Sequence, residues 1–97
     1  MVQKYLDRPY LIDNLKFDLR IYVLVYGMNP MRIYLFKDGL ARFATQEYEK
    51  PSSENKHNMF IHLTNFAINK KSDNFDAGEG DGDSGHKRSL VNILKHF

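Results

Sequence analysis

Three charged residues alternate with apolar residues in one stretch of the chain, and their spacing could serve binding or catalysis. Lys16, Asp18 and Arg20 occupy every second position, with apolar side chains between them. In a strand, side chains two residues apart lie on the same face, about 6.5–7 Å from each other. An ammonium, a carboxylate and a guanidinium grouped in this way fit an anion joined to a hydroxyl-bearing group, such as nucleotide phosphates with their ribose. A solvent-facing strand edge with cross-strand ion pairs is the alternative interpretation.

Two further stretches could join this site. Arg42 lies in a later predicted strand, and antiparallel pairing can bring it toward the same face as Arg20, although an ordinary exposed arginine fits the pattern equally well. Residues 62–65 offer an imidazole, a hydroxyl and an amide within four positions, and a locally capped turn is the alternative there. The residues alone therefore leave the site open.

Known metal-binding patterns do not fit the chain. Glu79, Asp81 and Asp83 alternate like the start of a calcium loop, but Ser84 stands where that loop needs glycine, and Leu90 where it needs glutamate. The four histidines have no zinc-ligand spacing. We therefore assign no metal-binding residue.

The elements that must position these residues are mainly strands. The stretch 17–26 is rich in β-branched and aromatic residues, which predicts a central strand. Glycine, proline and asparagine predict turns around it and an antiparallel meander. The predicted strands are 2–6, 17–26, 31–36 and 40–45, with turns at 27–30 and 37–39.

The second half of the chain is less regular. Residues 47–58 read as a surface loop, 59–63 as a short strand or tight turn, and 73–86 as a flexible loop rich in glycine and acidic residues. Ser89 can cap a truncated C-terminal helix whose apolar residues recur at helical spacing. The expected fold class is α+β, mostly an antiparallel β-meander.

Composition limits the classes of protein that remain. A chain of 97 residues with 42% hydrophobic residues is expected to form one domain at most. The absence of cysteine excludes disulfides, thiolate zinc sites and thiol catalysis, and favours a cytoplasmic protein. A net charge of +2 gives no argument for a nucleic-acid partner, and no apolar run is long enough to cross a membrane. Residues 21–26 are apolar throughout, which suits a sheet covered on both faces and suggests a piece of a larger fold.

Several stretches of the chain form a set of motifs, namely Gln3-Lys4-Tyr5-Leu6 with Pro9, Leu11-Ile12-Asp13, Lys16-Phe17-Asp18-Leu19-Arg20, Arg32-Ile33-Tyr34-Leu35, Gly39-Leu40-Ala41-Arg42-Phe43-Ala44-Thr45, His62-Leu63-Thr64-Asn65 and Ile68-Asn69-Lys70. In these motifs and in their order, over nearly its whole length, the chain resembles the tubulin tyrosine ligase-like proteins. The glutamylating branch is the nearer likeness, through Leu11-Ile12-Asp13 ahead of Lys16-Phe17-Asp18-Leu19-Arg20 and through Gly39-Leu40-Ala41-Arg42-Phe43-Ala44-Thr45.

The resemblance implies part of an ATP-grasp domain covering residues 1–97. Such a ligase uses ATP and Mg²⁺ to activate a carboxylate as an acyl phosphate, which the amine of an amino acid, here glutamate, then attacks. By likeness, Arg20 and Arg42 would be catalytic and address the phosphates. The residues implied to bind the nucleotide are Gln3, Lys4, Tyr5, Leu6, Lys16, Asp18, Arg20, Arg42, His62, Leu63, Thr64 and Asn65.

The resemblance also implies partners and a location. Tubulin or microtubules would be the substrate, in the cytoplasm, on the cytoskeleton and at the cilium or basal body. The family's upstream ATP-gripping lysine and its downstream magnesium ligands have no counterpart in this chain. We therefore expect the chain alone to be inactive, with the metal ligands outside it.

Two other readings remain open. A non-catalytic remnant could bind acidic tubulin tails through Lys70, Lys71, Lys87 and Arg88. A small RNA-binding β module could use Tyr22, Tyr34 and Phe36 as stacking platforms, although core packing explains these aromatics better.

Overall fold

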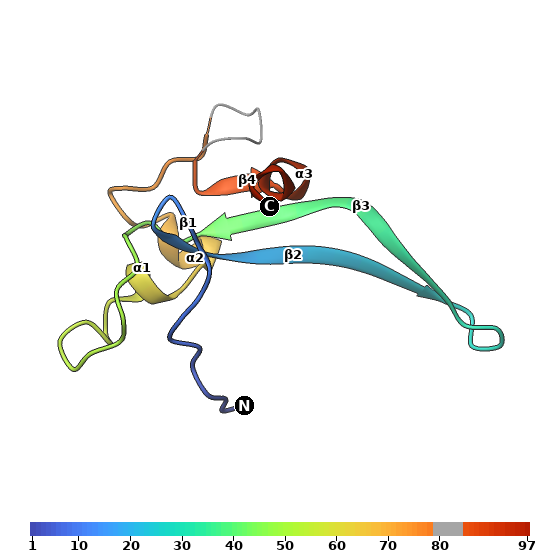
Figure 1. The fold of residues 1–97 in the computed structure, drawn as a ribbon, viewed down its shortest axis with the longest axis horizontal. Coiled ribbons are helices and arrows are strands. Elements are labelled where there is room, and N and C mark those ends of the chain that lie inside the picture. The colour runs from blue at the N-terminus through green and yellow to red at the C-terminus, as the bar shows by residue number, and fades with distance from the viewer. Residues whose placement is uncertain (79–84) are drawn as a thin grey trace. The chain divides into compact units, whose positions relative to one another are not determined.

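The computed structural model describes residues 1–78 and 85–97. The strands form a sheet in the order β1-β2-β3-β4, and short helices complete the described chain (Figure 1). The α+β class predicted from the sequence is confirmed. The elements are β1 (Leu11–Ile12), β2 (Leu15–Tyr26), β3 (Arg32–Phe43), α1 (Met59–His62), α2 (Phe66–Asn69), β4 (Lys87–Ser89), α3 (Leu90–Ile93) and the 3-10 helix η1 (Leu94–His96).

The chain divides into two compact units. Unit 1 comprises residues 1–17 and 43–75, and unit 2 comprises residues 18–42 and 76–97. In unit 1, β1 pairs antiparallel with the start of β2, and Leu11 lies opposite Lys16. In unit 2, β3 pairs antiparallel with β4, and Arg42 lies opposite Lys87. Each unit has its own small core.

The core of unit 1 lies under the start of β2 and the end of β3. Phe43 is almost fully buried, and its ring stacks on that of Phe17 with the centroids 5.4 Å apart. Ile12 and Ile61 are also buried. Asn58 caps α1 by accepting a hydrogen bond from the backbone N–H of Phe60, so α1 begins directly after the loop 47–58.

A buried asparagine fastens the second helix to this core. The Asn69 side-chain oxygen accepts hydrogen bonds from the N–H and hydroxyl of Thr45, at 3.0 and 2.9 Å. Its amide nitrogen donates to the carbonyl oxygens of Leu63 and Asn65. Because these bonds satisfy the whole amide, Asn69 ties the segment between α1 and α2 to Thr45, two residues after β3, without leaving its buried amide unpaired.

The turn predicted at residues 37–39 is wrong, because β3 runs unbroken from Arg32 to Phe43. The Asp38 carboxylate accepts hydrogen bonds from the backbone N–H groups of Gly39 and Val91, at 2.7 and 3.3 Å. A side chain at Gly39 would place its Cβ only 2.3 Å from the Arg20 carbonyl oxygen. Glycine is therefore used here for a close approach of two backbones, and not for a turn.

Replacing Gly39 with alanine is expected to destabilise the chain by roughly 2–3 kcal/mol, because the backbone of β2 or β3 must shift to admit the methyl group. Chemical unfolding of the wild-type and variant chains measures this difference. Lys37→Ala, at an exposed position on the same strand, is the control and should change the stability by less than about 0.5 kcal/mol. Equal unfolding midpoints for Gly39→Ala and Lys37→Ala would contradict the close approach.

Of the other predicted elements, the structure contains some and lacks others. Residues 2–6 form no strand. Where the sequence predicts a short strand or a tight turn at 59–63, the structure has the one-turn helix α1 (Met59–His62). The turn at 27–30 and the truncated C-terminal helix are confirmed, and the Ser89 hydroxyl accepts from the N–H of Asn92 as predicted. The predicted loop 73–86 lies partly outside the described residues. No helix in the described ranges has the length and hydropathy needed to cross a membrane.

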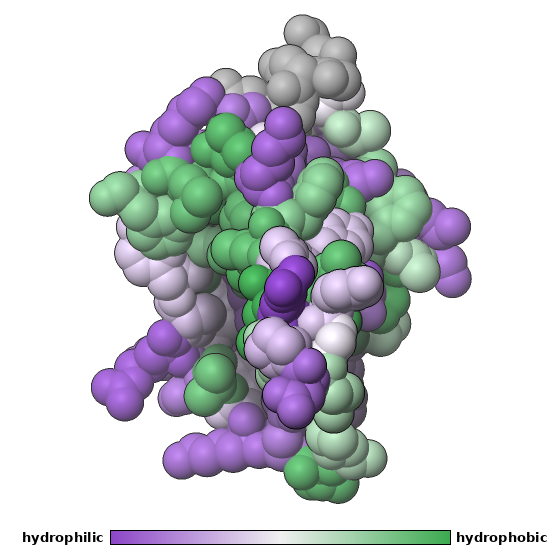
Figure 2. Space-filling model, turned by 90° about the vertical axis from the view of Figure 1, so that its right-hand side faces the viewer, coloured by the Kyte–Doolittle hydropathy of each residue, from purple (hydrophilic) through white to green (hydrophobic). Residues whose placement is uncertain are grey.

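The outer arms of β2 and β3, residues 21–26 and 33–36, run to the turn that joins the two strands (Figure 1). Their apolar side chains are exposed. Exposed fractions range from 47% at Tyr22 to 69% at Leu35. Figure 2, which views the structure from the side of the turn between these strands, shows hydrophobic surface open to solvent between hydrophilic groups. The sequence pattern predicts that both faces of this part of the sheet are buried. In the described part of the chain, no other segment covers them.

Candidate functional site

A lysine cluster in unit 1 brings together three of the residues predicted from the sequence. The Lys16 ammonium donates to the Tyr5 hydroxyl at 3.1 Å and to the His62 carbonyl oxygen at 3.0 Å. It also lies 4.3 Å from the centre of the Tyr5 ring. The Tyr5 hydroxyl is 3.0 Å from Nδ1 of His62. The start of β2, the N-terminal segment and α1 therefore fix one ammonium group.

This cluster borders a groove of about 780 Å³. The groove is lined by residues 3–10 together with Lys16 and Phe17, so it includes all four positions of the predicted hinge segment, Gln3, Lys4, Tyr5 and Leu6. The segment 1–6 has no regular structure, so its backbone N–H and C=O groups are not used in a helix or a strand. A volume of this size is typical of small-molecule sites.

A second tyrosine, Tyr48, contacts the His62 ring of this cluster. The Tyr48 hydroxyl donates to the Asp7 carbonyl oxygen at 2.9 Å, and its ring meets that of His62 edge to face. Burial, followed by the neighbouring Tyr5 hydroxyl, raises the pKa of Tyr48 to about 12. Tyr48 therefore stays neutral at physiological pH and acts as a hydrogen-bond donor. The sequence analysis did not identify it, because it lies in a stretch that reads as a polar loop.

Asp18 and Arg42 form an ion pair in unit 2. Nε of Arg42 donates to one carboxylate oxygen of Asp18 at 2.9 Å, and Nη2 donates to the other. The Asp18 side chain is 39% exposed and the Arg42 side chain is 24% exposed. The hydrogen bond to Asp18 raises the pKa of Arg42, opposed in part by burial. A guanidinium has five N–H donors, so the pair leaves others that can bind a phosphate oxygen.

The remaining predicted residues lie as follows. Arg20 is exposed on β2 in unit 2. Leu63 borders a second cavity of about 340 Å³ in unit 1, together with Tyr5 and His62. Thr64 and Asn65 lie between α1 and α2, and the Asn65 side chain makes no capping bond to α2. That all the predicted residues face a single nucleotide pocket stays a prediction.

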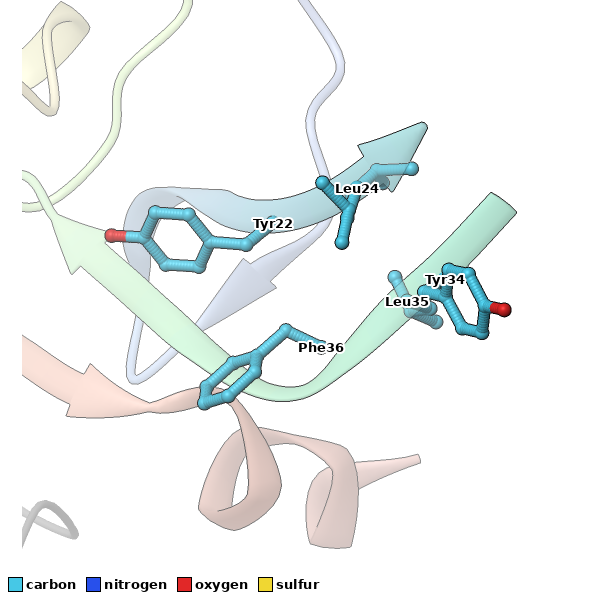
Figure 3. A pocket seen from close by; sticks show the side chains of 6 residues that line it. Tyr22, Leu24, Tyr34, Leu35 and Phe36 are labelled. Carbon is cyan, nitrogen blue, oxygen red and sulfur yellow. The ribbon is translucent and has the colours of Figure 1, made fainter. Parts of the chain in front are cut away.

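The outer arms carry an apolar groove of about 600 Å³, shown in Figure 3. Tyr22 and Leu24 project from β2, and Tyr34, Leu35 and Phe36 from β3. Tyr22 and Phe36 meet edge to face, with their ring centres 6.4 Å apart. Of the three aromatic residues weighed for RNA stacking, Tyr22 and Phe36 thus contact each other, while all three, including Tyr34, are about half exposed.

The basic residues considered for tubulin binding are divided between the units. Lys70 and Lys71 follow α2 in unit 1, where Lys70 lies 5.7 Å from the Phe66 ring. Lys87 and Arg88 belong to β4 in unit 2, and Nε of Arg88 donates to the Gly85 carbonyl oxygen. Among residues 1–78 and 85–97, no three acidic or histidine side chains come together as metal ligands would.

The sequence matches the pattern of the Tubulin-tyrosine ligase family over residues 1–97, and the chain belongs to this family. It is 52% identical over 97 residues to "Probable beta-tubulin polyglutamylase" of Tetrahymena thermophila, covering 98% of this chain and 8% of that protein. It is 50% identical over 88 residues to "Tubulin polyglutamylase TTLL6" of Homo sapiens, covering 91% of this chain and 10% of that protein.

A third relative gives the same picture. The chain is 46% identical over 94 residues to "Tubulin polyglutamylase TTLL11" of Homo sapiens, covering 97% of this chain and 13% of that protein. The chain thus spans about a tenth of the length of the curated relatives it matches. The family resemblance in the sequence is confirmed, and the similarity is to tubulin polyglutamylases.

Proposed function

We propose that this chain is the part of an ATP-grasp ligase that holds the nucleotide, in an enzyme that adds glutamate to tubulin tails. The observation that carries the proposal is the ammonium of Lys16, fixed by Tyr5 and His62 at a groove lined by the segment 3–6. A fixed cation beside exposed backbone hydrogen-bonding groups suits a nucleotide, which offers both an anion and a polar base. The match to polyglutamylases along the chain supports the same assignment.

The reaction proposed for the whole enzyme is the formation of an amide bond in two transfers. The carboxylate of the acceptor takes the γ-phosphoryl group of ATP, which leaves ADP and an acyl phosphate. The amine of glutamate then attacks the acyl carbon, loses a proton and displaces phosphate. Arg20 and Arg42 would neutralise charge on the phosphates, because phosphoryl transfer depends mainly on positioning and electrostatics.

Family likeness also implies Mg²⁺, but the described residues do not fit it. The Asp18 carboxylate is paired with Arg42, and no cluster of metal ligands exists among residues 1–78 and 85–97. We therefore give this chain no metal-binding role and derive no step through the ion. The metal ligands of the enzyme would belong to residues outside these 97.

The partners and the setting follow from the proposed reaction. The acceptor would be a carboxylate on the tail of tubulin or on a growing glutamate side chain, and the enzyme would act on the microtubule cytoskeleton, including that of cilia and basal bodies. The exposed apolar arms of β2 and β3 support a role as one part of a larger domain.

A chimera tests the proposed function. The 97 residues would replace the matching segment of the Tetrahymena protein, to which they are 52% identical. The chimera is expected to incorporate labelled glutamate into tubulin in the presence of ATP, whereas the isolated chain should show no turnover. A folded chimera that binds ATP but transfers no glutamate, or one that binds no ATP, would contradict the proposal.

A further inference from the structure

An asparagine outside the predicted site has a side-chain orientation that its neighbours determine. Nδ2 of Asn55 donates to the Lys50 carbonyl oxygen at 2.9 Å and to a carboxylate oxygen of Glu49 at 3.3 Å. Oδ1 accepts from the backbone N–H of Ser52 at 2.8 Å. Exchanging the amide oxygen and nitrogen would place like groups against each other at all three contacts. The atom that Asn55 presents to other groups is therefore an acceptor.

This acceptor lies 3.3 Å from Nε2 of His62. Because an amide oxygen cannot donate, Nε2 must carry the proton in this contact. A neutral imidazole has one N–H, so Nδ1 is then an acceptor and accepts a hydrogen bond from the Tyr5 hydroxyl, 3.0 Å away. The Tyr5 oxygen in turn accepts from Lys16. The donor and acceptor roles along the chain of hydrogen bonds thus follow from Asn55.

The imidazole ring has little freedom to leave this arrangement. His62 is only 8% exposed. The rings of Tyr5 and Tyr48 meet it edge to face, with centroids 5.7 and 6.1 Å away and interplanar angles of 90° and 84°. Turning the ring over would break the contacts of both nitrogens at once. Packing therefore holds the ring, and Asn55 selects which nitrogen carries the proton.

We propose that Asn55 is a positioning residue for Lys16. By holding His62 in the form protonated on Nε2, it makes Nδ1 an acceptor for the Tyr5 hydroxyl, and the Tyr5 oxygen then presents its lone pairs to the Lys16 ammonium. The ammonium is thereby held at the 780 Å³ groove, ready for an anionic or polar group of the ligand. The naming of a nucleotide as this ligand rests on the proposed function, whereas the order of hydrogen bonds does not.

The first test observes the protonation of His62 directly, in the chain labelled with ¹⁵N in its histidine rings. At pH 8 the wild-type chain should show the Nε2–H form of His62. Asn55→Leu removes the acceptor and should give a mixture of the two neutral forms, while Ser52→Ala, which removes only the contact of the Ser52 hydroxyl with the Asn55 N–H, should not. A wild-type ring protonated on Nδ1, or an unchanged ring in Asn55→Leu, would overturn the proposal.

A second histidine provides the internal reference. Nδ1 of His86 accepts from the backbone N–H of Asp76 at 2.9 Å, so His86 should also be protonated on Nε2. Asn55 belongs to unit 1, whereas Asp76 and His86 belong to unit 2. The signals of His86 should therefore be the same in the wild-type, Asn55→Leu and Ser52→Ala chains. A change confined to His62 supports the proposal, and equal changes at both histidines would overturn it, because they indicate general unfolding.

The second test uses the chimera and does not require the isolated chain to be well folded. Asn55→Leu should raise KM for ATP about 5- to 10-fold, as expected for one lost hydrogen bond, with kcat within about twofold. Tyr5→Phe, a conservative change at the other end of the chain of hydrogen bonds, should have the same effect. The double variant should be no worse than either single variant, because both act through Lys16.

The outcomes separate this proposal from the proposed function. Additive effects of the two substitutions, or a loss confined to kcat, would overturn the role of Asn55 even in an active chimera. A chimera that does not use ATP would contradict the proposed function, while the ¹⁵N measurement on the chain would still decide the protonation of His62. Agreement of both measurements assigns Asn55 as the residue that orients the lysine.

Discussion

Replacing Arg42 with alanine is expected to lower kcat of the chimera by at least about 10³-fold while leaving the protein folded. Arginines that meet the charge on a transferring phosphoryl group contribute rate factors of about this size. The ion pair of Arg42 with Asp18 is partly exposed, and such pairs contribute only about 0–1 kcal/mol to stability. Steady-state glutamylation with a thermal melt of the same sample measures both quantities.

A control must separate lost catalysis from a newly unpaired carboxylate. In Arg42→Ala the Asp18 carboxylate loses its partner, and its charge alone would repel phosphate. Combining Arg42→Ala with Asp18→Asn removes that charge and should restore little activity if Arg42 itself addresses the phosphates. Recovery of the rate in the double variant would contradict this role and leave the pair as a structural contact.

A matched arginine on the neighbouring strand completes the design. Arg88 lies on β4, where it pairs with Ala41 of β3, and its Nε is held by the Gly85 carbonyl oxygen. Arg88→Ala should change kcat by less than about threefold. An equal loss in Arg88→Ala and Arg42→Ala would show that any reduction in positive charge on this sheet has the same effect.

The sequence predicts the central strand well and the next one poorly, for physical reasons. Six of the ten residues in the stretch 17–26 are β-branched or aromatic, so the local preference of the sequence is enough to predict a strand there. In β3 the sequence Lys37-Asp38-Gly39 has the composition of a turn, but Asp38 bonds to the backbone of α3 and Gly39 makes room for the Arg20 carbonyl oxygen. Contacts distant in sequence decide the structure there, and a pattern of neighbouring residues does not contain them.

The helices α1 and α2 could not be predicted from the sequence, because both are too short to show a helical period of apolar residues. α1 and α2 have four residues each. They are held by side-chain contacts, namely the cap from Asn58 on α1 and the amide of Asn69 at the end of α2. A capping asparagine before an apolar triplet is the signal that could have identified α1.

The candidate site, too, could be predicted only in part from the sequence. Tyr5 and His62 are 57 residues apart, so their contact could not follow from spacing, and only the family resemblance brought them into one list. Asn55 was missed because it lies in a stretch rich in serine, asparagine and lysine that reads as a surface loop. Its importance depends on the direction of each hydrogen bond, which a sequence pattern does not give.

Placing charges on the outer arms of β2 and β3 is expected to have opposite effects in the chain and in the chimera. Ten side chains of residues 21–26 and 33–36 are exposed. Since a large apolar side chain offers about 150–250 Å², these arms leave on the order of 1,000 Å² uncovered. That is more than the apolar patches of about 300–600 Å² found on monomers, and comparable to one side of a stable interface. The proposed larger domain would bury it.

Leu24→Lys and Leu35→Lys test this directly, because these residues are 62% and 69% exposed in the chain. In the isolated chain the added charges should reduce self-association, as measured by sedimentation velocity, without lowering the unfolding midpoint. In the chimera the same lysines would be buried without partners, at a cost of several kcal/mol each, and should abolish folding and glutamylation.

Lys37→Glu is the control, since it alters the charge at an exposed polar position on the same strand and should be tolerated in both proteins. The test depends on whether the lysine substitutions are tolerated in the isolated chain and harmful in the chimera. A surface that is only incidentally apolar would accept lysine in either setting, so normal folding and activity of the lysine-substituted chimeras would mean that the arms face solvent in the larger protein. A loss confined to the chimera would indicate that the rest of the ligase packs on these two strands.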